Sequence, residues 1–307
     1  MKQKKHRMKL SAGEKIFTIV NYAFLASIFI LTLYPLIYVV SASFSDPVAV
    51  ASGKMILWPI DPTLDGYKFV FKYKEIWSGY ANTILYTVVG TILNLVVTLP
   101  AAYALARKDM AGRGFIMTLF IITMYFNGGL IPSYLNMNDF GLVNTRASML
   151  LVGLVSAYNL IVARTFFANS IPWELQEAAY LDGASTFKLF MKVILPLSSP
   201  IIVVLTLYYG IAHWNQYFNA MVYLRDRDLF PLQIVLKEIL TQSQLSAEAL
   251  NEGGFSPAEI AEMQSMSDTA NRMKYCVIVL SAAPMLAIYP WLQKYFAKGA
   301  MIGSVKG

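Results

Sequence analysis

The sequence ANTILYTVVGTILNLVVTLPAAYALA occupies residues 81–106 and contains no Asp, Glu, Lys or Arg. About 20 predominantly apolar residues are enough for a helix to cross the roughly 30 Å hydrocarbon core of a bilayer. Further runs of this kind lie near residues 16–40, 114–135, 147–168, 199–224 and 275–295. The chain is therefore predicted to be an all-α integral membrane protein with six transmembrane helices.

The composition of the 307 residues agrees with a membrane environment. Apolar residues make up 57% of the chain and charged residues only 14%, against about 25% charged residues in a typical soluble domain. The net charge of +7 comes from basic residues scattered among loops, so we do not expect nucleic acid as a partner. Cys276 is the only cysteine, which excludes an intrachain disulfide, an iron–sulfur cluster and a cysteine-based zinc site.

The distribution of basic residues predicts the orientation of the chain. The segments 1–15, 107–113, 164–198 and 294–307 hold 15 Lys and Arg in 71 residues, whereas 41–80, 136–146 and 225–274 hold 10 in 101. The denser set is expected on the cytoplasmic side, which puts both termini inside. A basic cytoplasmic tail, 1–15, then precedes a single transmembrane domain, 16–307. The run 16–40 exceeds the roughly 7–15 residues of a signal peptide core, so we interpret it as an uncleaved first span.

The longest soluble stretch is the extracytoplasmic loop 225–274, which carries eight acidic residues. Leu232–Leu240 and Pro257–Met266 are predicted to form short amphipathic helices separated by a break at Gly253-Gly254. This loop and the Pro- and aromatic-rich loop 41–80 suit a lid or a docking face. Composition alone fits equally well a second interpretation, in which each is a solvated loop with aromatic residues at the membrane interface.

The sequence lacks the motifs of an enzyme or an ion-coupled carrier. There is no phosphate-binding G-x-x-x-x-G-K-[ST] loop, no G-x-S-x-G nucleophile elbow and no partner for His6 or His213 at metal-ligand spacing. Ion-coupled carriers keep ionisable groups at mid-membrane, and the spans here have almost none. We therefore expect no enzymatic activity, bound cofactor or metal, and an energy source outside this chain.

The cytoplasmic loop 169–198 is predicted to form two short helices that meet at Gly183. Pro172 suits a first helical turn, and a glycine is a natural helix end. Ser185 can cap a second helix, which Pro196 is expected to end. The adjacent small residues Ala178 and Ala179 allow another surface to approach closely. The residues alone fit either a docking helix or an amphipathic connector on the membrane surface.

The order of residues in this loop resembles the EAA signature of ABC importer permeases. The matching residues are Glu177-Ala178-Ala179, Asp182-Gly183-Ala184, Phe190, Ile194-Leu195-Pro196 and Pro200. Outside the loop, Asn82-Thr83, the segment 100–107 and the tail 294–307 resemble the carbohydrate-uptake branch related to maltose permeases. Residues 127–134 and 164–167 resemble permeases for complex oligosaccharides, such as aldouronate- and alginate-type systems.

The resemblance implies a type I importer permease core in the bacterial cytoplasmic membrane. Its expected partners are a second permease subunit, in a heterodimer, two cytoplasmic ATPase subunits that use ATP and Mg, and an extracellular solute-binding protein that delivers an oligosaccharide. The residues expected to couple this chain to the ATPases are Glu177, Ala178, Ala179, Asp182, Gly183, Ala184 and Pro196. Two alternatives are a permease for a non-sugar solute and a non-transporting membrane scaffold or sensor.

The fifth apolar run is unusually rich in polar and aromatic residues. Amides facing hydrocarbon are costly, so Asn215, Gln216 and Asn219 are expected to face protein or a watery cavity. Amides and aromatic rings suit sugar hydroxyls and C–H faces, although the same residues also form hydrogen bonds between spans. His213 is expected to be a packed residue. The candidate residues for a sugar path are Asn127, Asn159, Tyr208, Trp214, Asn215, Phe218 and Asn219.

Overall fold

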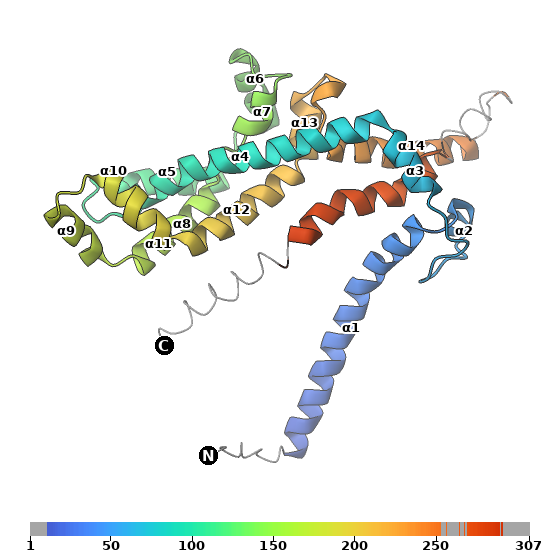
Figure 1. Cartoon of the computed structure of the whole chain (residues 1–307), viewed down its shortest axis with the longest axis horizontal. Coiled ribbons are helices and arrows are strands. Elements are labelled where there is room, and N and C mark those ends of the chain that lie inside the picture. Colours follow the sequence, from blue (N-terminus) through green and yellow to red (C-terminus); the bar gives the residue numbers. More distant parts are fainter. Residues whose placement is uncertain are drawn as a thin grey trace. The chain divides into compact units, whose positions relative to one another are not determined.

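The computed structural model describes residues 11–252, 256, 264, 267, 269–288 and 290. Throughout these residues the regular structure is helical, without a β-strand (Figure 1). The chain divides into two compact units. The first comprises Met1–Val70 and Gln242–Val279, and the second comprises Phe71–Thr241 and Leu280–Gly307.

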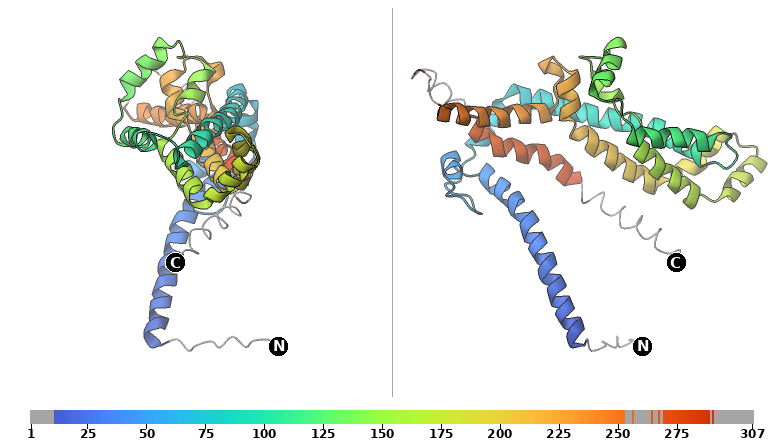
Figure 2. Two further views of the ribbon diagram at one scale, coloured as in Figure 1. Left: turned by 90° about the vertical axis from the view of Figure 1, so that its left-hand side faces the viewer. Right: turned by 180° about the vertical axis from the view of Figure 1, so that it is seen from behind.

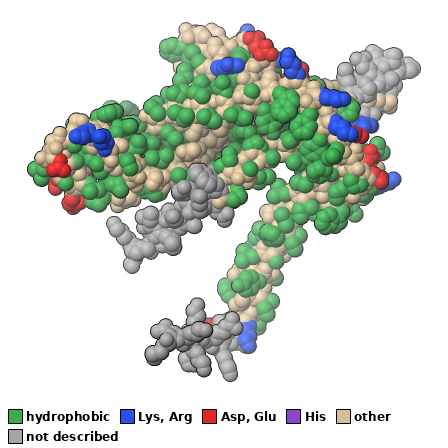
Figure 3. Space-filling view, in the orientation of Figure 1, with side chains coloured by type: hydrophobic (Ala, Val, Ile, Leu, Met, Phe, Trp, Pro, Cys, Tyr) green, Lys and Arg blue, Asp and Glu red, His purple; other side chains and the backbone are tan. Residues whose placement is uncertain are grey.

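The first unit begins with the long helix α1, Ala12–Ser43. A capping box starts it, in which the Ser11 amide donates to Glu14 (2.7 Å) and the Ser11 hydroxyl accepts from the Glu14 amide (3.3 Å). Hydrophobic side chains cover the visible face of α1 (Figure 3), and Phe17 and Leu31 are 73% and 72% exposed. This surface suits lipid or another membrane subunit.

Short helices follow α1 in the first unit: α2, Pro47–Ala51, and α3, Asp65–Lys72. The chain is also helical at 269–288. The Cys276 thiol donates to the carbonyl of Ser43 (3.3 Å). A Cβ at Gly66 would lie 2.5 Å from the Arg272 carbonyl oxygen, so glycine permits α3 to approach this helix closely.

The second unit is built on α4, Lys74–Ala106, which packs mainly against α8 and α12. The views in Figures 1 and 2 show α4 and α12 side by side. The helices that follow α4 in the chain are α5 Arg113–Tyr125, α6 Leu130–Asp139, α7 Arg146–Leu151, α8 Ala157–Ser170, α9 Trp173–Leu181, α10 Thr186–Leu189, the π-helix Phe190–Ile194, α11 Leu195–Leu197, α12 Ser199–Trp214, α13 Tyr217–Tyr223, the 3₁₀ turn Arg227–Leu229 and α14 Leu232–Glu252, whose residues from Gln242 on belong to the first unit.

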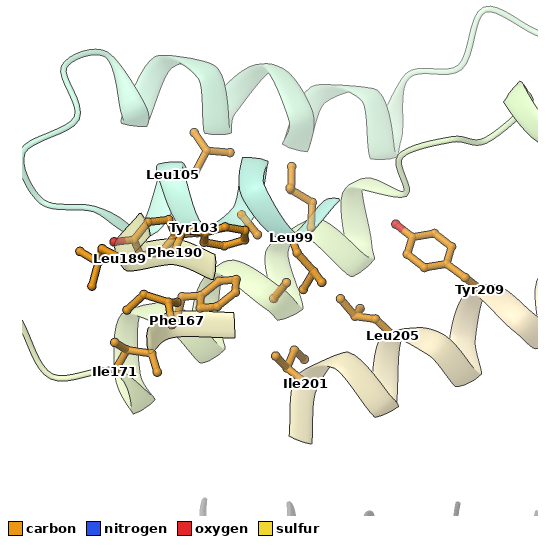
Figure 4. Packing of buried hydrophobic residues seen from close by; sticks show 14 residues of the cluster. Leu99, Tyr103, Leu105, Phe167, Ile171, Leu189, Phe190, Ile201, Leu205 and Tyr209 are labelled. Carbon is orange, nitrogen blue, oxygen red and sulfur yellow. The ribbon is translucent and has the colours of Figure 1, made fainter. Parts of the chain in front are cut away.

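The main hydrophobic core lies where α4, α8, α10, the π-helix and α12 converge (Figure 4). Its fully buried members include Leu160, Leu189, Ile194 and Leu205. Aromatic rings extend the core toward the loop that contains α9, because Tyr103 packs against Phe167 and Phe190 at centroid distances of 5.8 and 5.3 Å.

Three of the expected membrane helices are broken in the structure. The range 114–135 contains α5 and α6, bent by 117°; 147–168 contains α7 and α8; and 199–224 contains α12 and α13. The prediction of one helix in each range is wrong because apolar composition does not reveal a backbone break, such as that at Gly153 with its φ of +74°. Among the described residues, α1 and α4 alone are single helices long and apolar enough to cross a membrane, and the bent pairs raise the count to as many as four.

The segment 225–274 also differs from expectation. The helix predicted at Leu232–Leu240 continues as α14 to Glu252, because no helix-breaking residue follows until Gly253. The second predicted helix, Pro257–Met266, lies largely outside the described residues.

One buried polar side chain of α4, that of Asn94, satisfies peptide groups released at the break between α7 and α8. The Asn94 amide nitrogen donates to the carbonyls of Leu154 (2.7 Å) and Gly153 (3.3 Å). The Asn94 oxygen lies 2.7 Å from Nε2 of His213, which must carry the proton because an amide oxygen only accepts. His213 is therefore a packed residue, as expected, and it fixes the orientation of Asn94.

The crossing of α4 and α12 predicts a specific packing defect. A Cβ at Gly90 would lie 2.5 Å from Cε1 and Nε2 of His213, and the ring cannot move away without losing its bond to Asn94. We expect Gly90→Ala to destabilise the protein by about 1–3 kcal/mol through overpacking. Thermal unfolding of the purified protein in detergent measures the change.

Gly210→Ala, on the opposite helix of the same crossing, is the matched control. Its Cβ would lie 3.8 Å from the Thr91 hydroxyl, an ordinary contact, so this variant should unfold at the wild-type temperature or slightly above it. Equal unfolding temperatures for Gly90→Ala and wild type would contradict the close crossing.

Candidate functional site

The loop between α8 and α12 contains two helices joined by a tight turn, as the sequence predicted. Helix α9 ends at Leu181, and Gly183 adopts a left-handed φ of +71°. The Ala184 amide then donates back to the Ala179 carbonyl (2.9 Å). The Ser185 hydroxyl accepts from the Lys188 amide (3.3 Å) and so caps α10.

The prolines of this loop act differently from expectation. Pro172 is the N-cap of α9 instead of part of its first turn. Pro196 does not end the second helix, which continues through the π-helix to Leu197. A π-turn widens the backbone just before the ring and relieves the clash that proline causes in an α-helix. The chain then bends by 81° into α12.

The expected coupling residues lie at one end of the second unit, on or next to the loop surface. Glu177, Ala178, Asp182, Gly183 and Pro196 are exposed, and Ala179 and Ala184 are half-buried. Two large apolar side chains flank the turn: Leu181 is 89% exposed and Phe187 is 74% exposed. Figure 3 shows charged side chains among hydrophobic ones at this end. The surface therefore combines directed charge with unburied apolar area, which is typical of a docking site.

Aromatic and charged side chains fasten α9 to the end of α4. The Arg107 Nη1 donates to the Tyr180 hydroxyl (2.6 Å), which lies 3.2 Å from the Thr186 hydroxyl. The Arg107 guanidinium also lies 5.7 Å from the centre of the Tyr180 ring, within cation–π distance. One helix turn away, the Tyr103 hydroxyl donates to the Gln176 side-chain oxygen (3.1 Å).

Asp109 holds the Arg107 side chain in place. Arg107 Nε donates to Asp109 Oδ1 (2.9 Å), and the two side chains also form an ion pair. This hydrogen bonding raises the pKa of Arg107 and lowers that of Asp109. Sequence reasoning included Tyr103 and Arg107 only within the family-like segment 100–107, without a role, and did not single out Tyr180 or Gln176, because contacts across 73 residues leave no local signal.

The candidate sugar-path residues of α12 fall on two faces. Tyr208 on α12, Asn215 at its C-cap and Phe218 on α13 are exposed. Trp214 is buried, and its indole nitrogen donates to the Ser281 carbonyl (3.0 Å). Tyr158 of α8, which sequence reasoning missed, is 54% exposed and its ring centre lies 6.4 Å from that of Tyr208.

The three remaining candidate residues differ in burial. Asn159 is buried in α8. Asn127 is exposed at the break between α5 and α6, where its side-chain oxygen accepts from the Gly129 amide (2.9 Å). Asn219 is half-buried in α13.

Comparisons with known proteins agree over nearly the full length of the chain. Residues 76–302 match the family described as binding-protein-dependent transport system inner membrane component. Protein LplC of Bacillus subtilis (strain 168) is 36% identical over 302 residues, covering 98% of this chain and 99% of that protein. The polygalacturonan/rhamnogalacturonan transport system permease protein YtcP of the same organism is 35% identical over 294 residues, covering 95% and 99%.

A solved structure shows the same fold. It is the crystal structure of a bacterial ABC transporter involved in the import of the acidic polysaccharide alginate, with a TM-score of 0.83 and 36% identity. The match covers 94% of this chain and 99% of that one. The chain therefore belongs to the family of binding-protein-dependent transport system inner membrane components, the permeases of ABC importers, and is a transport subunit rather than an enzyme.

Proposed function

We propose that this chain is one of two permease subunits in an ATP-driven importer of oligosaccharides in the bacterial cytoplasmic membrane. Relatives of nearly equal length are named as transporters of polygalacturonan and rhamnogalacturonan and of arabinooligosaccharides. One observation carries the proposal: an exposed helix pair at 173–189 offers a docking surface for a separate energy source. The sequence itself has no ATP-binding loop, so two cytoplasmic ATPase subunits supply the ATP and Mg chemistry.

Coupling begins at the α9–α10 turn. Closure of the ATPases on ATP moves the docked surface around Glu177, and the loop passes this movement to the helices on which it is anchored. The π-helix and α11 connect the loop to α12 within one packed core, and a packed core transmits displacement because it has few voids. Two discrete states, open inward and open outward, are then biased by nucleotide and by loaded binding protein.

The sugar path lies on the exposed side of α12, between this chain and a second permease in a heterodimer. Tyr208 and Tyr158 present adjacent rings to a sugar's C–H faces. Asn215 is exposed at the C-cap of α12, where its amide nitrogen donates to the Ile211 carbonyl (3.0 Å), so its side-chain oxygen is available to a sugar hydroxyl. Phe218 and Asn219 continue this surface on α13, and Asn127 lies at the α5–α6 break. Trp214 and Asn159 support the path from within the protein.

Six membrane crossings and cytoplasmic termini complete the proposed topology. The positive-inside distribution supports this orientation, and each broken helix pair then counts as one crossing because non-helical backbone is tolerated where protein or a watery cavity surrounds it. The outer loop 225–274 is the docking surface for the extracellular solute-binding protein. Its net charge of −3 makes that contact sensitive to salt.

Two alternatives make different predictions for the assembled complex. A membrane scaffold or sensor would move no solute, and a permease for a peptide or for phosphate would not accept oligosaccharides. Uptake of labelled oligouronides and neutral oligosaccharides into proteoliposomes, with ATPases and binding protein present, separates these alternatives. Sugar uptake that requires ATP and binding protein is expected, and its absence would overturn the proposal.

Changes in the coupling loop should abolish transport without preventing assembly. Glu177→Lys reverses the charge at the docking surface. Gly183→Val places a β-branched residue at a φ of +71°, a conformation that costs roughly 1–2 kcal/mol for L-residues. We expect both variants to assemble normally and to lose at least about tenfold in uptake, which is within the usual range of roughly 5–150-fold for allosteric coupling.

Matched controls separate docking from general damage. Glu174→Lys reverses an exposed charge in the first turn of the same helix, and Gly112→Val creates the same strain at a φ of +73° outside the loop. Both controls should keep most of their uptake. Wild-type uptake in Glu177→Lys or Gly183→Val would remove the docking role from that residue.

Removing either exposed ring of the proposed sugar path should slow uptake. Tyr208→Ala and Tyr158→Ala each remove one ring of the exposed pair, which should lower uptake about two- to tenfold, as expected for an aromatic contact worth about 0.5–1.5 kcal/mol. Stimulation of ATP hydrolysis by loaded binding protein should remain. The control is Thr206→Ala, also exposed on α12, whose hydroxyl bonds only the Ile202 carbonyl of its own helix (2.7 Å). Equal uptake in all three variants would move the path away from this face.

A further inference from the structure

We propose that Arg107 and Tyr180 form a latch, which is a contact that transmits movement of the coupling loop, residues 169–198, directly to α4. Helix α4 then transmits the movement that follows ATP binding to the outer segment 228–232. This inference rests on the proposed function. Covalently, the loop is connected to α8 and α12, whereas α4 precedes it by more than 60 residues. A latch therefore adds a route that the chain connectivity does not provide.

The geometry of the latch suits the transmission of force. The Tyr180 hydroxyl accepts a charged hydrogen bond of 2.6 Å from Arg107, and such bonds are roughly twice as strong as neutral ones. The guanidinium also lies near the rings of Tyr103 (6.0 Å) and Tyr180 (5.7 Å). The Arg107 side chain is only 14% exposed, whereas Tyr180 is 39% exposed, so the latch lies at the protein surface with its cation largely covered by protein.

A second contact between α9 and α4 prevents rotation about the latch. Tyr103 lies one turn before Arg107 on α4, and Gln176 lies one turn before Tyr180 on α9. The hydrogen bond between Tyr103 and Gln176 is buried. Two parallel attachments prevent α9 from pivoting on the end of α4, so a displacement of α9 becomes a displacement of the helix axis.

Helix α4 can carry this displacement over its full length. Its 33 residues span about 50 Å at 1.5 Å per residue. Pro100 removes one backbone hydrogen bond, yet the helix continues to Ala106 because Leu99, Ala102 and Tyr103 pack into the main core. The helix therefore remains one body from the latch to its outer end.

At the outer end, three side chains of α4 hold the segment before α14. The Asn82 amide nitrogen donates to the Asp228 carbonyl (2.7 Å) and to the Phe230 carbonyl (3.1 Å). The Tyr86 hydroxyl donates to the Leu229 carbonyl (2.8 Å), and the Thr83 hydroxyl accepts from the Leu232 amide (2.9 Å). Movement of α4 must carry this segment with it or break four hydrogen bonds.

The assay uses the complete complex of both permeases, the ATPases and the binding protein in proteoliposomes. It measures basal ATP hydrolysis, its stimulation by loaded binding protein, and sugar uptake. Arg107→Met and Tyr180→Phe should each reduce the stimulation by about fivefold or more, the scale of a typical allosteric coupling. Basal hydrolysis should remain in Arg107→Met, because Arg107 lies outside the docking helices 173–189.

Further variants show whether the two residues act as one unit. Lys108→Met removes the neighbouring exposed charge and should leave the stimulation at the wild-type level. Arg107→Met combined with Tyr180→Phe should be no worse than the stronger single variant, because both changes break the same contact. A purely structural role would instead lower basal hydrolysis and complex yield together.

The outcomes distinguish this inference from the proposed function. If the wild-type complex takes up no sugar, the proposed function fails. If the wild-type complex works and Arg107→Met and Tyr180→Phe keep normal stimulation, the function stands and the latch is refuted. Additive losses in the double variant would also refute it, since the residues would then act separately.

Discussion

The polar side of α4 is the feature on which the second unit depends. Inside a membrane, every backbone group must find a hydrogen-bond partner within the protein, and the chain leaves several such groups free where its helices break. Side chains of α4 bind them at two places: Asn94 at the α7–α8 break and Asn82, Thr83 and Tyr86 at the segment before α14. Broken helices are thus compatible with an apolar environment.

This arrangement links local structure to transport. A helix that holds its neighbours by specific carbonyls moves them with it, so α4 joins the loop at one end of the unit to the outer segment at the other. The same end of α4 that enters the main core also meets the coupling loop through Tyr103 and Arg107. The helix breaks, which are costly in isolation, become positions where backbone bends without losing its partners.

Local signals were sufficient to predict some of these features from the sequence. The apolar runs located α1 and α4, and Gly183 and Ser185 marked the turn and cap of the coupling loop, because glycine and serine act through their own backbone neighbourhood. The breaks inside 114–135, 147–168 and 199–224 were missed because hydropathy does not depend on backbone conformation. The roles of Asn94 and Tyr180 depend on tertiary contacts. Trp214 is aromatic like the exposed Tyr208 and was predicted to line the sugar path for that reason. Its indole nitrogen instead donates to the Ser281 carbonyl, and the side chain is buried.

The distance between the two ends of this unit tests the central claim most directly. Spin labels at Leu181 and Asp228, both exposed, report on the coupling loop and the outer segment. Cys276→Ser removes the only native cysteine and keeps a donor for the Ser43 carbonyl. Pulsed electron paramagnetic resonance measures the distance between the two spin labels in the complete complex. If α4 carries both ends as one body, this distance is the same without nucleotide and with ATP bound. A nucleotide-dependent change of several ångströms would show that the ends move independently and would contradict the account.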